Sequence, residues 1–287
     1  MVNKKDSVVS LSNVSRYLKD KLKINLHKDP YQQKYVKSLI DSTEKTQAIF
    51  LDAPAGTGKT SLAISVAYYL LEKKQIDQIV YVRNAVSIRD MGFLPGDIAE
   101  KEAPYLQSGL DALGKLDPMN KKLIETLMEN NKLIVTSTAF LRGADWDGRK
   151  FLIIDEAQNL DLNEMQTVLT RPHDETKIVV IGSSLQCDTK LTEKRNPKVE
   201  DKPKLLAFQL YAEHFTKYTD LNVESLELKN NYRGKFSQYA DKINETIKYL
   251  GNPDADIESH QLSLAPSDLE DEKAAKLWEE LAGAINK

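Results

Sequence analysis

The sequence has little that would indicate secretion or a membrane. A single cysteine, Cys187, stands among 287 residues, so no internal disulfide can form and nothing points to an oxidising compartment. No apolar run approaches the roughly 18–20 residues that a membrane-spanning helix needs, and residues 1–7 lack the apolar stretch of a secretion signal. We therefore expect a cytoplasmic protein, of a bacterial cell or a phage-infected host, with no membrane partner.

An excess of positive charge is lacking as well. The 40 lysines and arginines are outnumbered by 43 aspartates and glutamates, for a formal net charge of −3. This balance excludes a broadly basic surface that wraps nucleic acid, although it allows a local basic groove. What is present is a hydrophobic fraction of 41%, which is enough to bury the core of one large α/β domain.

Five short apolar runs have the character of strands that are buried on both faces. Strands of a parallel sheet are apolar throughout because helices cover both sides of the sheet. Stretches of helical periodicity separate these runs, which predicts a three-layer α/β/α fold with a mostly parallel sheet and ligands at the carboxyl ends of its strands. The runs are residues 48–51, 79–82, 133–136, 151–154 and 177–182, and helices are expected at 8–26, 31–41, 61–72, 205–218, 236–250 and 267–286.

The first of these runs leads into a glycine-rich loop that reads A-P-A-G-T-G-K-T-S. It matches the phosphate-binding signature G-x-x-x-x-G-K-[ST], with Ala53 in place of the first glycine. Small residues let backbone N–H groups face phosphate oxygens, and the following helix adds its positive end. We expect Mg-ATP to bind here, with Lys59 on the β- and γ-phosphates and Thr60 on Mg²⁺; the binding residues are Ala53, Pro54, Ala55, Gly56, Thr57, Gly58, Lys59, Thr60 and Ser61.

Two adjacent carboxylates, Asp155 and Glu156, end the apolar run at 151–154. In a P-loop enzyme an aspartate in this position holds Mg²⁺, usually through water. The neighbouring glutamate can take a proton from an attacking water molecule. The pair predicts ATP hydrolysis, although two acids at the start of a helix can also serve only as a cap.

Two further residues have a place in this chemistry. Gln186 follows the run at 177–182, where its amide can contact both the attacking water and the γ-phosphate. Arg233 stands immediately before an expected helix, and an arginine that reaches the γ-phosphate raises the rate of hydrolysis by roughly 10³–10⁵. Each also has a plain alternative, an ordinary loop glutamine and a surface arginine with a local partner.

Several blocks of the sequence together resemble the PhoH-like ATPases, a family named for phosphate-starvation induction and common in bacteria and their phages. The G-F-L-P-G-D block is the most specific of them, because a generic P-loop does not predict it. The resemblance runs from about Gln32 to Arg233. Its blocks are residues 81–86, 91–97 with Glu100 and Lys101, 104–106, 139–143 and 155–159.

The core of this family is similar to the first motor domain of superfamily 1 helicases. The resemblance therefore implies ATP hydrolysis coupled to RNA or single-stranded nucleic acid, and a ring-shaped hexamer as in several members. It also implies that Gln32 reads adenine, with Gln33 as the neighbouring alternative, and that Arg83 lies where such motors touch nucleic acid. Arg142 is a second candidate for nucleic-acid contact, and the bland alternative for both arginines is a structural or surface role.

The chain departs from the family pattern in two places. Ser183 stands where the family usually has an aspartate near the metal, and the segment at Arg233 is closer to the N-Y-R motif of full superfamily 1 helicases. Only 54 residues follow Arg233 (287 − 233), so we expect no complete second motor domain in this chain, and the arginine could serve its own site or that of a neighbouring subunit. We expect an N-terminal helical extension at 1–25, a P-loop ATPase core at 26–250 and a helical tail at 251–287.

Two other functions fit parts of the sequence. A small-molecule P-loop kinase needs a mobile basic lid, which the polar, net positive loop at 190–204 could form, but the D-E-A-Q sequence favours water as the acceptor. A nucleotide-gated binding or assembly module with little turnover is the third hypothesis, and the missing acid at Ser183 gives it weight.

Overall fold

The computed structural model describes residues 9–83, 107, 109–138, 147–186, 205–240 and 242. The chain divides into a compact unit of residues 1–237 and a second unit of residues 238–287, and the fold below is that of the first. Arg142, the loop at 190–204 and the tail helix at 267–286 lie outside the described residues. No described helix is both long enough and apolar enough to cross a membrane.

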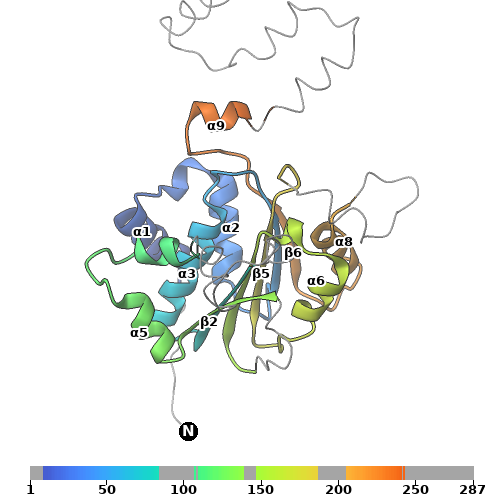
Figure 1. The fold of residues 1–287 in the computed structure, drawn as a ribbon, viewed down its shortest axis with the longest axis horizontal. Coiled ribbons are helices and arrows are strands. Elements are labelled where there is room, and N and C mark those ends of the chain that lie inside the picture. The colour runs from blue at the N-terminus through green and yellow to red at the C-terminus, as the bar shows by residue number, and fades with distance from the viewer. Residues whose placement is uncertain are drawn as a thin grey trace, which may run out of the picture. The chain divides into compact units, whose positions relative to one another are not determined.

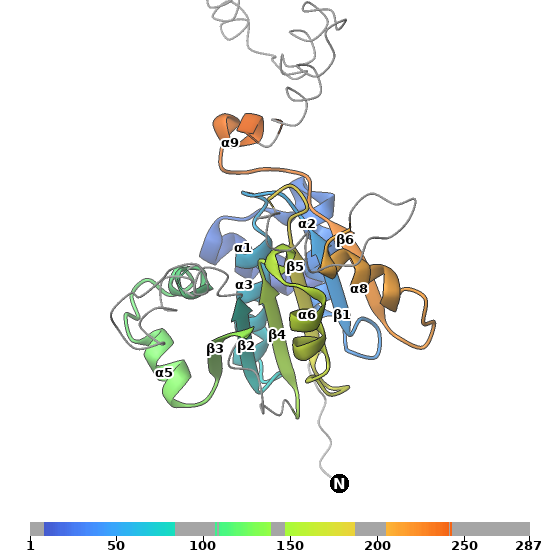
Figure 2. The same ribbon diagram turned by 45° about the vertical axis from the view of Figure 1, so that its right-hand side comes forward.

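Six parallel strands form one sheet in the order β3-β2-β4-β5-β1-β6 (Figures 1 and 2). The five strands predicted from apolar runs are all present. The sixth was not predicted, because this edge strand reads V-E-S-L-E and buries only Leu226. The strands are β1 (Ala48–Asp52), β2 (Gln78–Arg83), β3 (Leu133–Ser137), β4 (Lys150–Asp155), β5 (Lys177–Gly182) and β6 (Val223–Glu227).

Helices cover both faces of the sheet, which confirms the three-layer α/β/α prediction (Figure 2). Alternate residues of β1 separate the two cores: Ile49 and Leu51 pack with α1, α2 and α3, whereas Ala48 and Phe50 pack with α6 and α8. On the first side lie α1 (Leu11–Leu22), α2 (Pro30–Ile40), α3 (Lys59–Glu72) and α5 (Leu123–Glu129); on the second lie α6 (Leu162–Leu169) and α8 (Ala207–Phe215). The structure also describes a short helix, α9 (Lys235–Ala240), the 3₁₀ turns η1 (Leu26–Lys28) and η4 (Ala157–Asn159), and a helical segment at 109–114.

Local sequence determines where these helices start. Asp29 caps α2 by accepting hydrogen bonds from the N–H groups of Tyr31 and Gln32, and Pro30 occupies the first turn, where its missing N–H costs nothing. Asp161 and Glu164 form a reciprocal capping box at the start of α6. The start of α2 was predicted from the sequence, whereas α6 was not predicted.

A buried polar cluster joins the amino-terminal ends of the strands. The Lys177 ammonium, at the start of β5, donates to the backbone carbonyls of Ser38 and Thr46. The hydroxyls of Ser38 and Thr46 in turn donate to the carboxylate of Glu224 at 2.9 and 2.6 Å. Lys177 is only 4% exposed, and burial lowers its pKa to about 8. The cluster ties α2 and the turn before β1 to β5 and β6.

Candidate active site

The residues singled out in the sequence meet at the opposite, carboxyl-terminal end of the sheet. β1 leads into the glycine-rich loop, β4 ends on Asp155, and β5 ends just before Ser183. Parallel strands present their carboxyl ends on one edge, so motifs that are a hundred residues apart converge there.

The loop between β1 and α3 depends on two glycines with positive φ. Gly56 has φ +75° and Gly58 has φ +83°, a region that other residues rarely adopt. A Cβ on Gly56 would also lie 2.2 Å from Oδ1 of Asn231. The loop can therefore turn tightly ahead of α3, and no side chain caps that helix. Its first N–H groups form an N-terminus suited to an anion such as phosphate.

Lys59 is the first residue of α3 and its side chain folds back over the loop. Its ammonium donates to the carbonyls of Ala53 at 3.0 Å and Pro54 at 3.4 Å. Burial lowers the pKa of Lys59, while Glu156 and Asp155 act in the opposite direction. Both contacts are local in sequence, so the ammonium can exchange them for phosphate oxygens without disturbing the fold.

Asp155 is buried beside the start of α3. Each of its carboxylate oxygens lies 3.1 Å from the Thr60 hydroxyl, which donates to the pair. The Tyr81 hydroxyl donates to Oδ2 at 2.7 Å. The pKa of Asp155 is raised, because burial and the neighbouring Glu156 outweigh the opposite effect of the hydrogen bond from Tyr81.

The hydroxyl of Thr60 and the carboxylate of Asp155 fit a magnesium ion. Mg²⁺ takes oxygen ligands and is usually held by one or two carboxylates together with water and substrate phosphates. Among the described residues no three His, Cys, Asp or Glu side chains gather to hold a metal by themselves.

Glu156 has an unusual backbone conformation. Its φ of +55° and ψ of +39° lie in the left-handed region, which costs a residue with a Cβ about 1–2 kcal/mol. Its N–H donates to Oδ1 of Asp155, and its carboxylate lies between two donors. These are Nε2 of Gln158 at 2.6 Å and the guanidinium of Arg83 at 3.5 Å. Strain of this kind is typical of functional sites.

Gln158 connects the acidic pair to the end of β5. Its Nε2 donates to Glu156 and, at 3.3 Å, to the backbone carbonyl of Gln186, and its Oε1 accepts from the N–H of Ser183. The Gln186 side chain itself is exposed. The Ser183 hydroxyl is buried and has no hydrogen-bond partner within the described residues. The role of Gln158 was missed, because nothing in the sequence shows that it faces β5.

Asp52 is a further residue that the sequence analysis missed. It ends β1 and accepts hydrogen bonds from the N–H of Ser184 at 2.9 Å and from Nε2 of Gln209 at 3.2 Å. The residue just before the phosphate-binding loop is thus tied to the end of β5 and to α8. The sequence does show an acidic residue at the end of this strand, but only the loop that follows it was interpreted as functional.

Gln32 and Asp29 bring the start of α2 to the same loop. Nε2 of Gln32 donates to the Thr57 carbonyl at 2.9 Å. Oδ2 of Asp29 accepts from the Tyr232 hydroxyl at 2.7 Å, and although burial opposes the change, hydrogen bonds from Tyr232 and Gln32 lower the pKa of Asp29. The N–H of Tyr232 also donates to the Gly56 carbonyl. Tyr232 belongs to the N-Y-R motif, of which the sequence analysis considered only the arginine.

Arg233 lies at the phosphate-binding loop of its own chain. Its Cγ would be 3.0 Å from a Cβ placed on Gly56, and its charge contributes to the lowered pKa of Lys59. The guanidinium is exposed, as a group that has to reach a ligand requires. The structure thus places Lys59, Asp155 and Arg233 around the glycine-rich loop, whereas Gln186 joins this group only through its backbone carbonyl.

Of the two candidate nucleic-acid residues, Arg83 and Arg142, the structure describes only Arg83. Arg83 ends β2 and pairs with Glu156, whereas Arg142 lies outside the described residues. Another arginine, Arg149, precedes β4 and forms a bidentate pair with Asp77 at 2.8 and 3.1 Å. It lies at the amino-terminal end of the sheet, so it cannot share one groove with Arg83.

The family model described as PhoH-like protein matches residues 24–233. The chain belongs to the PhoH family. The match covers both the phosphate-binding loop and the segment that ends at Arg233.

Curated PhoH relatives match over a shorter stretch. A PhoH-like protein of Mycobacterium leprae is 39% identical over 153 residues, which is 53% of this chain and 43% of the relative. A PhoH-like protein of Bacillus subtilis is 36% identical over 158 residues, covering 55% and 47%. Protein PhoH of Escherichia coli K12 is 34% identical over 164 residues, covering 57% and 45%. The matched region thus spans less than half the length of each of these relatives.

Two solved structures have a low similarity to this chain. The SWI2/SNF2 ATPase core of Sulfolobus solfataricus, solved with double-stranded DNA, has a TM-score of 0.37 at 17% identity and covers 80% of this chain and 41% of that chain. The Pif1 helicase of Candida albicans has a TM-score of 0.33 at 18% identity and covers 75% and 43%. Scores and identities this low carry no inference about function.

Proposed function

We propose that this PhoH-family chain binds ATP with Mg²⁺, hydrolyses it, and couples hydrolysis to RNA or single-stranded nucleic acid. The observation that supports this most strongly is the pairing of Thr60 with Asp155. It places a P-loop hydroxyl on the carboxylate at the end of β4, beside the ammonium of Lys59. Family membership and the geometry point in the same direction.

Each group has a role in the proposed reaction. Lys59 leaves the carbonyls of Ala53 and Pro54 to contact the β- and γ-phosphates, while the N-terminus of α3 holds phosphate oxygens. Thr60 and Asp155 hold Mg²⁺, which when bound neutralises charge on the phosphates. Mg²⁺ usually retains several waters, so Asp155 can act through water.

Glu156 accepts the proton of the attacking water. Gln158 and Arg83 both present N–H donors to this carboxylate, which orients it and suits its anionic form. Gln186 senses the γ-phosphate from the loop after β5. Gln158 contacts both Glu156 and the Gln186 backbone, so a movement of the loop after β5 would change the position of the Glu156 carboxylate.

The remaining contacts concern the γ-phosphate and the base of the nucleotide. Arg233 acts in cis, since it lies beside Gly56 of its own chain. Gln32 reads adenine from the start of α2, where it is already bonded to the loop carbonyl of Thr57. Gln32, and not Gln33, makes this contact with the loop.

The nucleic-acid part of the proposal rests on the family resemblance. Arg83 and Arg142 are the residues it assigns to that contact. Arg83 also pairs with Glu156, so a nucleic-acid phosphate that attracts Arg83 changes the charge next to the base. That exchange is a direct route by which nucleic acid could alter turnover. A hexameric ring and a cytoplasmic location belong to the same proposal.

Phosphate release in the absence of any acceptor separates the candidate functions. We expect the chain to release phosphate from Mg-ATP with water alone, and faster when single-stranded RNA is added. Release that requires a small-molecule acceptor would identify a kinase. Tight nucleotide binding without turnover, with or without RNA, would identify a nucleotide-gated binding module and overturn the proposal.

The assigned base has its own test. Glu156→Gln keeps the shape of the side chain but cannot accept the proton, so turnover should fall by roughly 10²–10⁴ while ATP affinity stays within a few-fold. Glu125→Gln, an exposed glutamate in the first turn of α5, is the matched control and should leave both quantities unchanged. Unchanged turnover in Glu156→Gln would refute the assignment.

A further inference from the structure

β2 contacts both members of the acidic pair through two side chains that point to the same face. Tyr81 and Arg83 are two residues apart on the strand, and side chains with that spacing share a face of the sheet. The Tyr81 hydroxyl donates to Asp155 at 2.7 Å, and the Arg83 guanidinium lies 3.5 Å from Glu156. Tyr81 is 74 residues from Asp155 in the sequence and belongs to none of the ATP-binding motifs.

The hydrogen bond from Tyr81 restricts the orientation of the Asp155 carboxylate. Thr60 donates to this carboxylate from one element and Tyr81 from another, and both groups of the contact from Tyr81 are buried. A buried donor that loses its acceptor is costly, so the pair stays together as the site works. Residues of this kind, which hold a metal-binding side chain in place, commonly affect metal affinity by roughly 10–100-fold.

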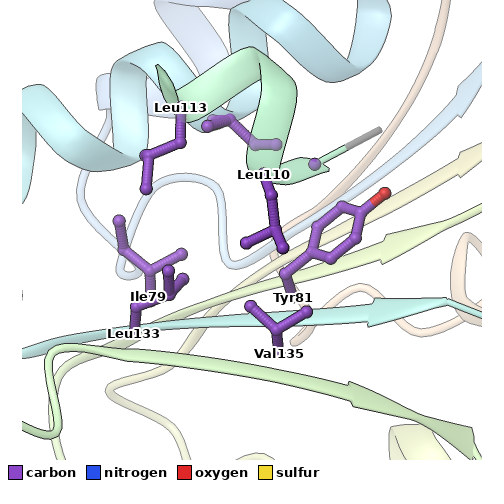
Figure 3. A pocket seen from close by; sticks show the side chains of 8 residues that line it. Ile79, Tyr81, Leu110, Leu113, Leu133 and Val135 are labelled. Carbon is purple, nitrogen blue, oxygen red and sulfur yellow. The ribbon is translucent and has the colours of Figure 1, made fainter. Parts of the chain in front are cut away.

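The ring of Tyr81 packs closely against Gly109 and also adjoins a small apolar cavity. A Cβ added to Gly109 would lie 2.6 Å from two ring atoms of Tyr81, which is closer than any real side chain packs. An apolar cavity of about 10 Å³ also adjoins the ring, and Gly109 lines it together with Ile79, Leu133 and Val135 (Figure 3). The figure shows the hydroxyl at the end of the ring away from Ile79 and Leu133.

This packing makes Gly109 necessary for the position of the hydroxyl. Residues 109–114 are helical, so an alanine at 109 would suit the helix itself. A methyl group there would nevertheless lie 2.6 Å from the ring, so either the ring or the segment at 109–114 has to shift. A ring that shifts in this way withdraws its hydroxyl from Asp155.

We propose that Tyr81 is a positioning residue that orients Asp155 for Mg²⁺, and that Gly109 permits this by leaving space for the Tyr81 ring. The inference rests on the proposed function, since Asp155 must serve the metal. It adds to that function a residue on β2 and a contact with residues 109–114. The segment at 109–114 thereby becomes a place from which magnesium affinity can be altered without touching the nucleotide.

Tyr81→Phe is the decisive variant because it removes only the hydroxyl. We expect the Mg²⁺ concentration for half-maximal phosphate release at saturating ATP to rise roughly 10-fold. The maximal rate at saturating Mg²⁺ should return to within about threefold of wild type, since a positioning role affects binding of the metal more than the chemistry. Binding of a non-hydrolysable ATP analogue should show the same increase in Mg²⁺ requirement, and its affinity without Mg²⁺ should not change.

Two controls separate positioning from a general structural effect. Tyr17→Phe removes another buried tyrosine hydroxyl, on α1, and should leave the Mg²⁺ dependence unchanged. Gly109→Ala should raise the Mg²⁺ requirement in the same direction as Tyr81→Phe, whereas Gly114→Ala, where a Cβ meets nothing within 4 Å, should not. The double variant Tyr81→Phe/Gly109→Ala should be no worse than the worse single variant, because both act through one hydroxyl.

The outcomes distinguish this inference from the function on which it rests. A wild-type chain that shows no Mg²⁺-dependent nucleotide binding and no phosphate release overturns both. A wild-type chain that behaves as proposed, together with a Tyr81→Phe variant whose Mg²⁺ requirement stays within about twofold, overturns the inference alone. An effect of Tyr81→Phe without any effect of Gly109→Ala removes Gly109 from it.

Discussion

Two lysines at opposite ends of the same sheet, the half-buried Lys59 and the buried Lys177, differ in what their contacts do. Lys59 and Lys177 each donate to two backbone carbonyls, and burial lowers the pKa of each. The acceptors of Lys59 are five and six residues away in sequence, whereas those of Lys177 are 131 and 139 residues away. A lysine with local contacts can exchange them for a ligand, and one with long-range contacts holds the fold together.

The largest expected effects are opposite for the two lysines: replacing Lys59 should reduce turnover, and replacing Lys177 should reduce stability. Lys59→Ala should lower the rate of phosphate release by roughly 10²-fold or more, because the positive charge that faces the phosphates is lost. Its free energy of unfolding should stay within about 1 kcal/mol of that of wild type. Lys177→Met should destabilise the chain by about 2–4 kcal/mol, because the Ser38 and Thr46 carbonyls lose a buried donor. Steady-state turnover and urea unfolding of both variants measure the two effects.

The opposite pattern would contradict the comparison. If Lys59→Ala unfolded readily, its contacts with Ala53 and Pro54 would be structural. If Lys177→Met kept full stability but changed the ATP concentration for half-maximal turnover, the cluster at the amino-terminal end would belong to the site.

The second effect is a pH dependence that only Lys177 should produce. Its pKa is about 8 in the fold against 10.5 for an ordinary lysine, so the unfolded chain binds more protons between these values and stability rises with pH there. This contribution is fully present above the unfolded pKa and is lost as pH falls through the folded pKa. From pH 7 to pH 9.5 wild type should gain about 2 kcal/mol relative to Lys177→Met.

Urea unfolding of both proteins at several pH values checks this figure. Subtracting the variant removes the contribution of the tyrosines and other lysines that titrate in the same range. A difference that is flat with pH would mean that Lys177 keeps an ordinary pKa in the folded chain.

The smallest effects come from a pair of helix caps. Ser10 caps α1 and Asp29 caps α2, and replacing either with alanine should cost about 1 kcal/mol of unfolding free energy. Asp29 also accepts a hydrogen bond from the Tyr232 hydroxyl, and the Tyr232 N–H donates to the Gly56 carbonyl of the loop. Only Asp29→Ala should therefore weaken ATP binding as well, by a few-fold. Equal ATP affinities of the two variants, measured by titration calorimetry, would show that the link from Asp29 to the loop is without consequence.

The sequence predicted the interior of this fold better than its edge. Runs such as residues 151–154 and 177–182 are apolar because both of their faces are covered, and that signal is local. β6 carries two glutamates and buries little, so its pairing with β1 depends on the rest of the sheet and leaves no local pattern. The short helix α6 was missed in spite of its capping box at Asp161 and Glu164.

For the candidate site, sequence motifs named the residues that would touch the ligand but not those that hold them. The glycine-rich loop, Asp155 and Glu156 are recognisable because the spacing of their residue types carries the chemistry. Tyr81 and Gln158 contact them through the tertiary fold, across 74 residues in the case of Tyr81, and no spacing rule describes that. The left-handed backbone of Glu156 was equally invisible, since glutamate has no preference for it.

The hydrogen bond between Tyr232 and Asp29 has a consequence for the order in which the molecule is built. Its partners are 203 residues apart, so the start of the core and its end both contribute residues that contact the glycine-rich loop. Chains are synthesised from the N-terminus, at about 5–20 residues per second. The glycine-rich loop therefore emerges from the ribosome long before Tyr232 and Arg233, and a growing chain passes through a period in which it carries the loop without the residues that enclose it.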